Sequence, residues 1–302
     1  MGGAFIEVQV ELPAEMAEIV AAELGELLGG VEIRDAETIF PTARDRAAVI
    51  ALCPPEELGD VLAHTEEVLA TARAAGTEVD PVAIRQRSAH EDEWRDVWKQ
   101  FFRTTRIGTH FIVRPSWDEG DGVAIAKGDH VIDLDPGRAF GTGAHPSTRL
   151  VIGALERRRD AGMRPQSFLD LGCGSGILSI AAHRLWPAAR GLAVDLDEEA
   201  TACTEENFVR NDVKGVAVVA GTIESLTGEF DLIVANIQRD VLELIVDGVT
   251  ARLAPGGALV LSGLLTSDAD PVQRVYEARG FAFVERVDEG EWASLVFTAA
   301  AK

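Results

Sequence analysis

Apolar and polar positions follow a strand-like alternation or a helix-like spacing along most of the first 87 residues. Strands are predicted where the two kinds of residue alternate, and helices where apolar residues recur every three or four positions. The strand-helix-strand-strand-helix-strand order that results predicts a ferredoxin-like α+β domain over residues 1–87, which is a common interaction module. The predicted elements are the strand Phe5–Val10, the helix Pro13–Leu28, the strands Val31–Arg34 and Ala47–Leu52, the helix from Glu56 to Ala75 and the strand Val82–Arg87.

An aromatic stripe separates this first part from the rest of the chain. Trp94, Trp98, Phe101 and Phe102 fall near one face of a helix predicted within residues 88–105. A stripe of this kind packs a helix against a neighbouring domain more often than it takes part in chemistry. We therefore interpret residues 88–105 as a linker helix that docks on a neighbouring domain.

The remainder, residues 106–302, forms a second predicted domain. It starts with the strands Thr105–Arg114 and Val123–Leu134 and becomes regular from Phe168 onward. Strands and helices then alternate, which predicts a doubly wound α/β sheet whose ligands bind at the carboxyl ends of the strands. Two strands in a row at the end predict an antiparallel hairpin, typical of a nucleoside-binding fold. The predicted strands are 168–171, 191–195, 216–220, 230–235, 258–262, 281–287 and 292–298, and the helices 177–185, 198–210, 239–253 and 271–279.

Composition narrows the class of partner. The 302 residues carry 28 Lys and Arg against 50 Asp and Glu, a formal net charge of −22. This charge repels nucleic acid phosphates and favours a basic peptide or protein partner, although strong net charge also serves solubility alone. The three cysteines have no metal-like spacing, and neither an export signal nor a membrane span is apparent. We expect a cytoplasmic protein that does not bind membranes and does not read nucleic acid directly.

A glycine-rich turn follows the first regular strand. Gly172, Gly174 and Gly176 allow positive φ and let a ligand approach main-chain N–H groups, although a glycine-rich turn alone is also compatible with a purely structural role. The Gly-x-Gly-x-Gly spacing differs from the dinucleotide fingerprint, so a sulfonium nucleoside fits better than NAD. Asp170, just before the turn, is expected to face the cationic or amino-acid end of that ligand.

Polar residues end the next strands of the predicted sheet. Asp195 follows the second strand 19 positions after Gly176, where a carboxylate accepts hydrogen bonds from ribose hydroxyls. Glu198 and Glu199 instead complement the dipole of the next helix. Thr222 follows the third strand, where an adenine is expected to lie.

Asn236 ends the fourth strand of the regular region. An amide offers donors and an acceptor without charge, which suits holding an amine so that its lone pair faces an electrophilic methyl group. Asn236 is also placed to cap the helix predicted from Arg239, so both roles stay open at this point.

A second glycine-rich segment, Asp135–Thr148, precedes the regular region. Pro146 suits the first turn of a helix, so the segment is either an ordinary capped loop or a flap that closes on a ligand. Three glycines around Phe140 and Thr142 favour the flap.

These motifs together resemble those of the bacterial PrmA family. The resemblance rests on Asp135–Thr148 (DPGRAFGTGAHPST), Leu169–Leu178 (LDLGCGSGIL), Asn236-Ile237 and Pro255–Gly263 (PGGALVLSG), and it extends over nearly the whole chain. It implies a class I (Rossmann-like) methyltransferase domain over residues 106–302 that uses S-adenosyl-L-methionine. It also implies as substrate a basic protein, the eleventh protein of the large ribosomal subunit, methylated on lysine side chains and on its N-terminal α-amine.

The resemblance also assigns site residues. Thr142, Gly143, Gly172, Asp195 and Asn236 would contact the cofactor, while Phe140 and Asn236 would lie near the incoming amine. The ferredoxin-like domain would recruit the substrate, and the enzyme is expected to act as a monomer without a metal ion.

One departure from the family pattern and one alternative remain. Gln238 stands where the family pattern leads us to expect Leu, which bears on the shape of the amine entrance. The alternative is a lysine methyltransferase of the same fold that acts on a different protein.

Overall fold

The structure is a computed structural model in which two compact units, Met1–Phe101 and Phe102–Lys302, are each described by themselves. It describes residues 4–28, 31–34, 45–74, 77, 79, 81–90, 103–118, 122–135 and 145–299. The linker helix predicted within residues 88–105 lies largely outside these ranges, so its aromatic stripe remains a sequence-based prediction.

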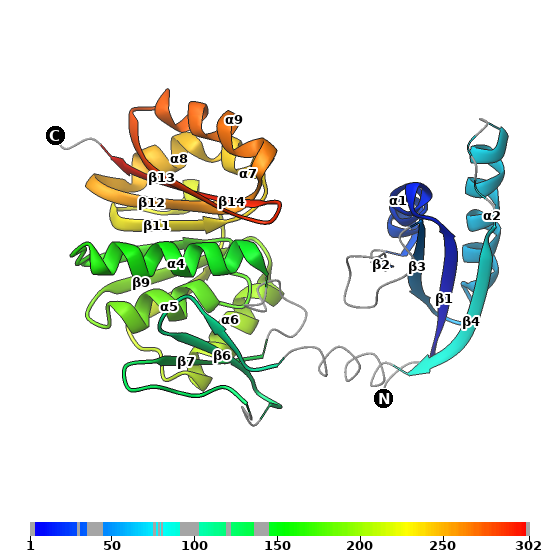
Figure 1. The fold of residues 1–302 in the computed structure, drawn as a ribbon, viewed down its shortest axis with the longest axis horizontal. Helices are drawn as coiled ribbons and strands as arrows, with labels where there is room; N and C mark the ends of the chain where they lie inside the picture. The colour runs from blue at the N-terminus through cyan, green and yellow to red at the C-terminus, as the bar shows by residue number, and fades with distance from the viewer. Residues whose placement is uncertain are drawn as a thin grey trace. The chain divides into compact units, whose positions relative to one another are not determined.

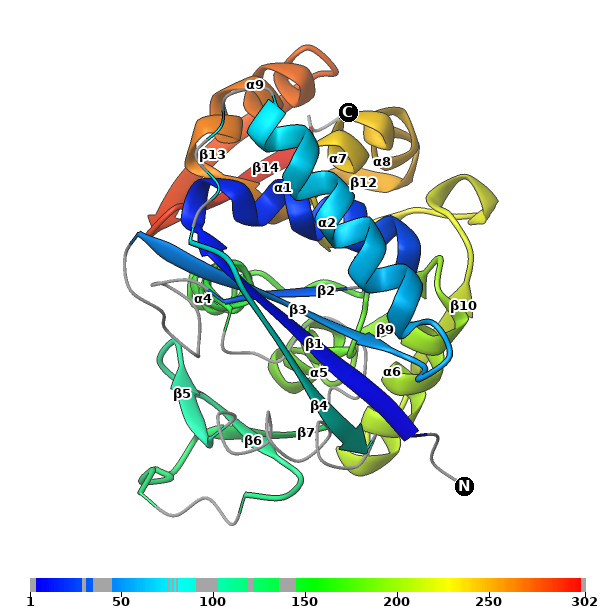
Figure 2. The same cartoon turned by 90° about the vertical axis from the view of Figure 1, so that its right-hand side faces the viewer.

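The first unit is an antiparallel four-stranded sheet in the order β2-β3-β1-β4, which confirms the predicted ferredoxin-like order. Helices α1 and α2 pack on the sheet through a common apolar core and are well seen in Figure 2. The elements are β1 (Ala4–Pro13), α1 (Ala17–Leu28), β2 (Val31–Arg34), β3 (Arg46–Cys53), α2 (Leu58–Ala74) and β4 (Ala83–His90).

Strand β1 shows why this sheet has one apolar and one polar face. Successive side chains of a strand point to opposite faces, and Val8, Val10 and Leu12 are fully buried in the core beneath the helices. On the other face, the carboxylate of Glu7 accepts hydrogen bonds of 2.8 and 2.6 Å from Nε and Nη2 of Arg87 on β4. The alternation seen in the sequence therefore corresponds to a half-buried sheet.

The second unit contains a seven-stranded sheet in the order β10-β9-β8-β11-β12-β14-β13. The first five strands are parallel, and β14 pairs antiparallel with both β12 and β13, which confirms the predicted terminal hairpin. The strands of this sheet are β8 (Ser167–Leu171), β9 (Arg190–Asp195), β10 (Val216–Ala220), β11 (Phe230–Asn236), β12 (Leu253–Leu265), β13 (Phe281–Glu289) and β14 (Trp292–Ala299).

Helices cover both faces of this sheet (Figure 1). One apolar core joins the sheet to α4, α5 and α6, and a second joins the opposite face to α7, α8 and α9. Both faces are buried, as expected for a parallel sheet with helical crossovers. The helices are α4 (Pro146–Asp160), α5 (Ile177–Leu185), α6 (Glu198–Arg210), α7 (Arg239–Leu244), α8 (Val246–Arg252) and α9 (Thr266–Glu277).

A small three-stranded sheet precedes the large one, and here the predicted strands were too long. The strand predicted over Thr105–Arg114 is a hairpin of β5 (Thr105–Ile107) and β6 (Phe111–Pro115), because the chain turns at Gly108 with φ of +59°. Of the strand predicted over Val123–Leu134, only β7 (His130–Leu134) is formed, and it pairs in parallel with β6.

Two predicted helices also differ from the structure. The helix expected over 239–253 is two helices, α7 and α8, which meet at Ile245. Leu242, Val246 and Val249 are all buried in the same core, so the apolar spacing continues through the break and hides it. Helix α9 begins five residues before the predicted start at Pro271, which lies inside the helix.

Within the described ranges, no helix has both the length and the hydropathy needed to cross a lipid bilayer.

Candidate functional site

A cavity of about 670 Å³ opens where the parallel strands β8, β9 and β11 end. Its position agrees with the rule that ligands bind outside the carboxyl ends of the strands in open α/β sheets. Gly172, Gly174, Asp195, Thr222 and Asn236 line this cavity, so the structure brings together five of the residues predicted from the sequence. Their convergence at one edge makes it the candidate site.

The three glycines of the turn do not have the same role. Gly172 and Gly174 line the cavity with φ of +69° and +53°. A Cβ atom on Gly172 would lie 2.5 Å from Cγ2 of Ile237, so a side chain there would push a residue of the cavity wall. Gly176 caps helix α5 instead and lies against Thr204, where a Cβ would come within 2.9 Å of Cγ2. Gly176 is not among the residues that line the cavity, so its predicted contact with the ligand stays a prediction.

The Asp195 carboxylate is oriented by two main-chain groups. The N–H of Gly174 donates to Oδ2 at 2.9 Å, and the N–H of Asp197 donates to Oδ1 at 3.1 Å. A carboxylate has about four lone-pair positions, so each oxygen keeps the capacity to accept another hydrogen bond. The two hydrogen bonds thus fix the carboxylate at the cavity wall and leave accepting capacity on both oxygens.

Asp170 is placed differently from the predicted position. Its side chain is fully buried below the turn and does not line the cavity. Oδ2 accepts a hydrogen bond of 2.7 Å from Oγ of Ser179 on α5, whereas Oδ1 has no hydrogen-bond partner among the described residues. Burial raises the pKa of this carboxyl to about 7, against the lowering effect of the Ser179 hydrogen bond. The structure therefore does not bring Asp170 to the cavity wall.

Asn236 contributes a buried amide to the wall of the cavity. Its Nδ2 group donates to Oγ1 of Thr148 at 3.3 Å, and Thr148 is itself fully buried in the first turn of α4. The Oδ1 atom of Asn236 is buried and has no partner in the part of the chain that the structure describes. Both residues line the cavity, so this buried oxygen, which has no partner among the described residues, belongs to a side chain of the cavity wall.

Two further wall residues were not assigned from the sequence, His145 and Trp292. Their rings meet edge to face with centroids 4.4 Å apart, and both line the cavity. His145 also caps α4, because its Nδ1 accepts the N–H of Ser147 at 3.3 Å. Burial, followed by the charge of Arg149, lowers the pKa of His145. The sequence signal that could have identified His145 is its place directly before Pro146, at a predicted helix start.

The remaining predicted residues are placed as follows. Thr222 lines the cavity directly before the short helical turn Ile223–Ser225, and the apolar residues Ile223 and Leu196 line the same cavity. Phe140, Thr142 and Gly143 lie outside the described residues.

The cavity combines an apolar lining with two oriented oxygen acceptors. The Asp195 carboxylate suits a ribose, and the apolar residues near Thr222 suit the flat base of a nucleoside. On the wall formed by Asn236, the buried Oδ1 suits an N–H group that enters without a full positive charge. The geometry therefore fits a nucleoside beside an amine.

Comparison with known proteins agrees with this geometry. The sequence model of the family described as ribosomal protein L11 methyltransferase (PrmA) matches residues 4–300. The chain is 36% identical to the ribosomal protein L11 methyltransferase of Geobacter metallireducens over 306 residues, with 99% of each chain covered. The protein of the same name from Geobacter sulfurreducens is 37% identical, with 96% of this chain and 97% of that protein covered.

A crystal structure of the ribosomal protein L11 methylase from Lactobacillus delbrueckii subsp. bulgaricus is similar as well. It superposes with a TM-score of 0.60 at 30% sequence identity, and the match covers 66% of this chain and all of that one. The second unit has the terminal antiparallel hairpin predicted from the sequence. The family model matches nearly the whole chain, this unit included. The chain belongs to the PrmA family of ribosomal protein L11 methyltransferases, which are S-adenosylmethionine-dependent enzymes with a class I fold.

Proposed function

We propose that this enzyme transfers methyl groups from S-adenosylmethionine to lysine side chains and to the N-terminal α-amine of ribosomal protein L11. The observation that carries the proposal is the buried Oδ1 of Asn236, which has no hydrogen-bond partner among the described residues and belongs to a side chain that lines the same cavity as Asp195. An orphaned acceptor at this place fits an N–H group of an amine substrate.

The residues of the cavity fit the methyl donor. Asp195 would accept hydrogen bonds from the ribose hydroxyls, and Gly172 and Gly174 would let the donor approach the main chain. Thr222 would lie beside the adenine. S-adenosylmethionine supplies an electrophilic methyl group bound to a positively charged sulfur.

Asn236 would orient the attacking amine. By accepting one N–H, its Oδ1 leaves the nitrogen lone pair free to point at the methyl group. The amine must be neutral, which costs about 4–5 kcal/mol for a lysine of pKa near 10.4 at pH 7 and about 1–1.5 kcal/mol for an α-amine of pKa near 8. The α-amine is therefore the easier target, and the apolar lining lowers the pKa of a lysine that enters.

The family resemblance adds residues to this proposal. Thr142 and Gly143 would contact the donor, and Phe140 would lie near the amine, although all three fall outside the described residues. In this proposal, residues 1–87 form the domain that recruits the substrate, and residues 106–302 form the domain that catalyses the transfer.

The setting of the reaction is part of the proposal too. With a net charge of −22, the enzyme would attract a basic ribosomal protein and would not read nucleic acid directly. We propose that it works in the cytoplasm as a monomer. The KM for L11 should then rise with ionic strength, because salt screens the attraction between opposite charges.

Intact-mass analysis of L11 after incubation with the enzyme and labelled S-adenosylmethionine tests the proposal. Label on the N-terminal amine and on lysines is expected, and absence of label would overturn it. Asn236→Ala should lower kcat by about 10- to 100-fold, because a hydrogen bond to a group that becomes charged is lost. Its affinity for S-adenosylhomocysteine should change much less, since Asp195 and the glycine turn remain. Label on a different protein only would favour a methyltransferase with another substrate.

A further inference from the structure

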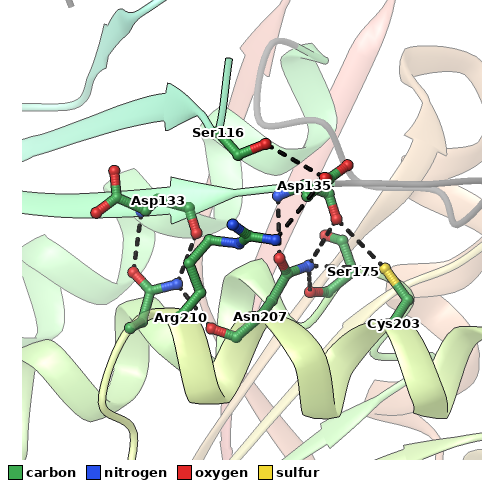
Figure 3. A network of polar contacts seen from close by, with 8 residues as sticks. Ser116, Asp133, Asp135, Ser175, Cys203, Asn207 and Arg210 are labelled. Atoms are coloured by element: carbon green, nitrogen blue, oxygen red, sulfur yellow. Dashed lines mark hydrogen bonds and ion pairs between the residues drawn. The ribbon is translucent and has the colours of Figure 1, made fainter. Parts of the chain in front are cut away.

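A network of polar contacts joins the end of strand β7, the glycine turn and helix α6 (Figure 3). None of its labelled residues lines the cavity. The contacts connect main-chain atoms of the strand and of the turn to side chains of the helix. The labelled members are Ser116, Asp133, Asp135, Ser175, Cys203, Asn207 and Arg210.

Asn207 lies at the centre of this network and is fully buried. Its Oδ1 accepts the N–H of Asp135 at 2.9 Å, and its Nδ2 donates to the carbonyl of Asp135 at 3.0 Å. The same Nδ2 donates its second hydrogen to the carbonyl of Ser175 in the glycine turn at 2.9 Å. One amide therefore ties the end of β7 to the turn that lines the cavity.

A second side chain of α6 holds the adjacent carbonyl of the turn. Oγ1 of Thr204 donates to the carbonyl of Gly174 at 2.8 Å. The N–H of Gly174 in turn donates to the Asp195 carboxylate. Hydrogen bonds from α6 therefore hold two successive carbonyls, those of Gly174 and Ser175, in a turn where Gly174 and Gly176 adopt positive φ.

Asn211, one turn further along, provides an internal comparison. Its Oδ1 accepts the N–H of Asp133 at 2.9 Å, and its Nδ2 donates to the carbonyls of Asp133 at 2.7 Å and of Asn207 at 2.8 Å. Asn211 is also buried. It clamps β7 as Asn207 does, but the side-chain bonds described for it do not reach the glycine turn.

We propose that Asn207 is a positioning residue for binding of the methyl donor, because it fixes the glycine turn in the orientation in which Gly174 meets Asp195. Thr204 assists by holding the preceding carbonyl. The inference rests on the proposed function only in that the cavity takes S-adenosylmethionine. The buried face of α6 would then contribute to the affinity for the cofactor as well as to the stability of the fold.

The matched variants Asn207→Asp and Asn211→Asp test this assignment. Each keeps the shape of the side chain and the acceptor for β7, and each loses the Nδ2 donor. We expect similar losses of thermal stability. Only Asn207→Asp should raise the Kd for S-adenosylhomocysteine, measured by calorimetry, and the KM for S-adenosylmethionine, by about tenfold. The kcat at saturating concentrations of both substrates should stay within about threefold, since Asn236 is untouched.

Thr204→Val is the second test, and it decides the matter if Asn207→Asp does not fold. It removes the hydroxyl contacts with the Gly174 carbonyl and with Sγ of Cys173, both in the turn, and should raise the same Kd by about threefold. A wild-type Kd in the foldable variants, or an equal rise in Asn211→Asp, would overturn the inference and indicate a purely structural role. A failure of the proposed function is distinguishable, because the wild-type enzyme itself would then not bind S-adenosylhomocysteine or not label L11.

Discussion

The Nδ2 group of Asn236 lies 3.3 Å from Oγ1 of Thr148, although 88 positions separate the two residues in the chain. Asn236 ends β11, and Thr148 is fully buried in the first turn of α4. An amide side chain that donates to one fixed partner keeps its oxygen on the opposite side. The contact thus leaves Oδ1 of Asn236 on the other side of the amide, where it has no partner among the residues that the structure describes.

Thr148→Val should lower kcat by about five- to tenfold, because the Asn236 amide loses the partner that fixes its orientation. Steady-state kinetics with L11 at saturating S-adenosylmethionine measure this effect. Thr148→Ser keeps the hydroxyl and should stay close to wild type. If Thr148→Val were as active as Thr148→Ser, the amide would not depend on this contact.

Gly172→Ala should weaken both folding and donor binding. The residue adopts φ of +69°, and its new Cβ would lie 2.5 Å from Cγ2 of Ile237. Strain at positive φ alone costs about 1–2 kcal/mol, and displacement of Ile237 adds to it. Thermal unfolding with and without S-adenosylhomocysteine measures both losses.

Gly162→Ala is the matched control for Gly172→Ala. Gly162 has φ of +92°, but a Cβ there would meet no atom within 4 Å. This variant should therefore show the strain alone and keep the full stabilisation by S-adenosylhomocysteine. Equal behaviour of the two variants would mean that the approach of Ile237 to the turn is unimportant.

The position of the candidate site could be predicted from local sequence. Asp195 and Asn236 follow apolar runs that form buried parallel strands, and the carboxyl ends of such strands meet at one edge. The glycine turn is equally local, because the need for positive φ appears as glycine itself. The strand ends and the glycine turn are therefore enough to predict where the cavity lies.

Partners distant in the chain could not be predicted in this way. Asp170 has a polar neighbour, Ser179, on the helix that covers its face of the sheet, so its carboxyl turns inward and away from the cavity. Nothing in the sequence around His145 indicates its contact with Trp292, which comes from the last strand of the chain. The break at Ile245 was hidden for a related reason, since both helices bury residues in the same core.

Asp195→Ala should raise the Kd for S-adenosylhomocysteine by at least about 50-fold, because charged acceptors for the ribose hydroxyls are lost. Calorimetry measures the change. Asp197→Ala is the control two positions later, where the carboxylate caps α6 by accepting the N–H of Glu199 at 2.8 Å. It should cost about 1 kcal/mol of stability and leave binding intact. Strong binding by Asp195→Ala would contradict the role of this carboxylate as the ribose acceptor.

Asp170 should make the stability of the second unit depend on pH, and Asp170→Asn should remove this contribution. Burial raises the pKa of this carboxyl from 3.8 to about 7. Between these two pH values, the carboxyl is protonated in the folded protein and ionised in the unfolded chain. Stability from this group is present below about pH 4, falls as the pH rises to about 7, and stays low above it. The full change is on the order of 4 kcal/mol. Thermal unfolding should therefore show Asp170→Asn gaining on wild type between pH 5 and pH 8. An equal difference in Tm at both values would mean that Asp170 does not titrate in this range.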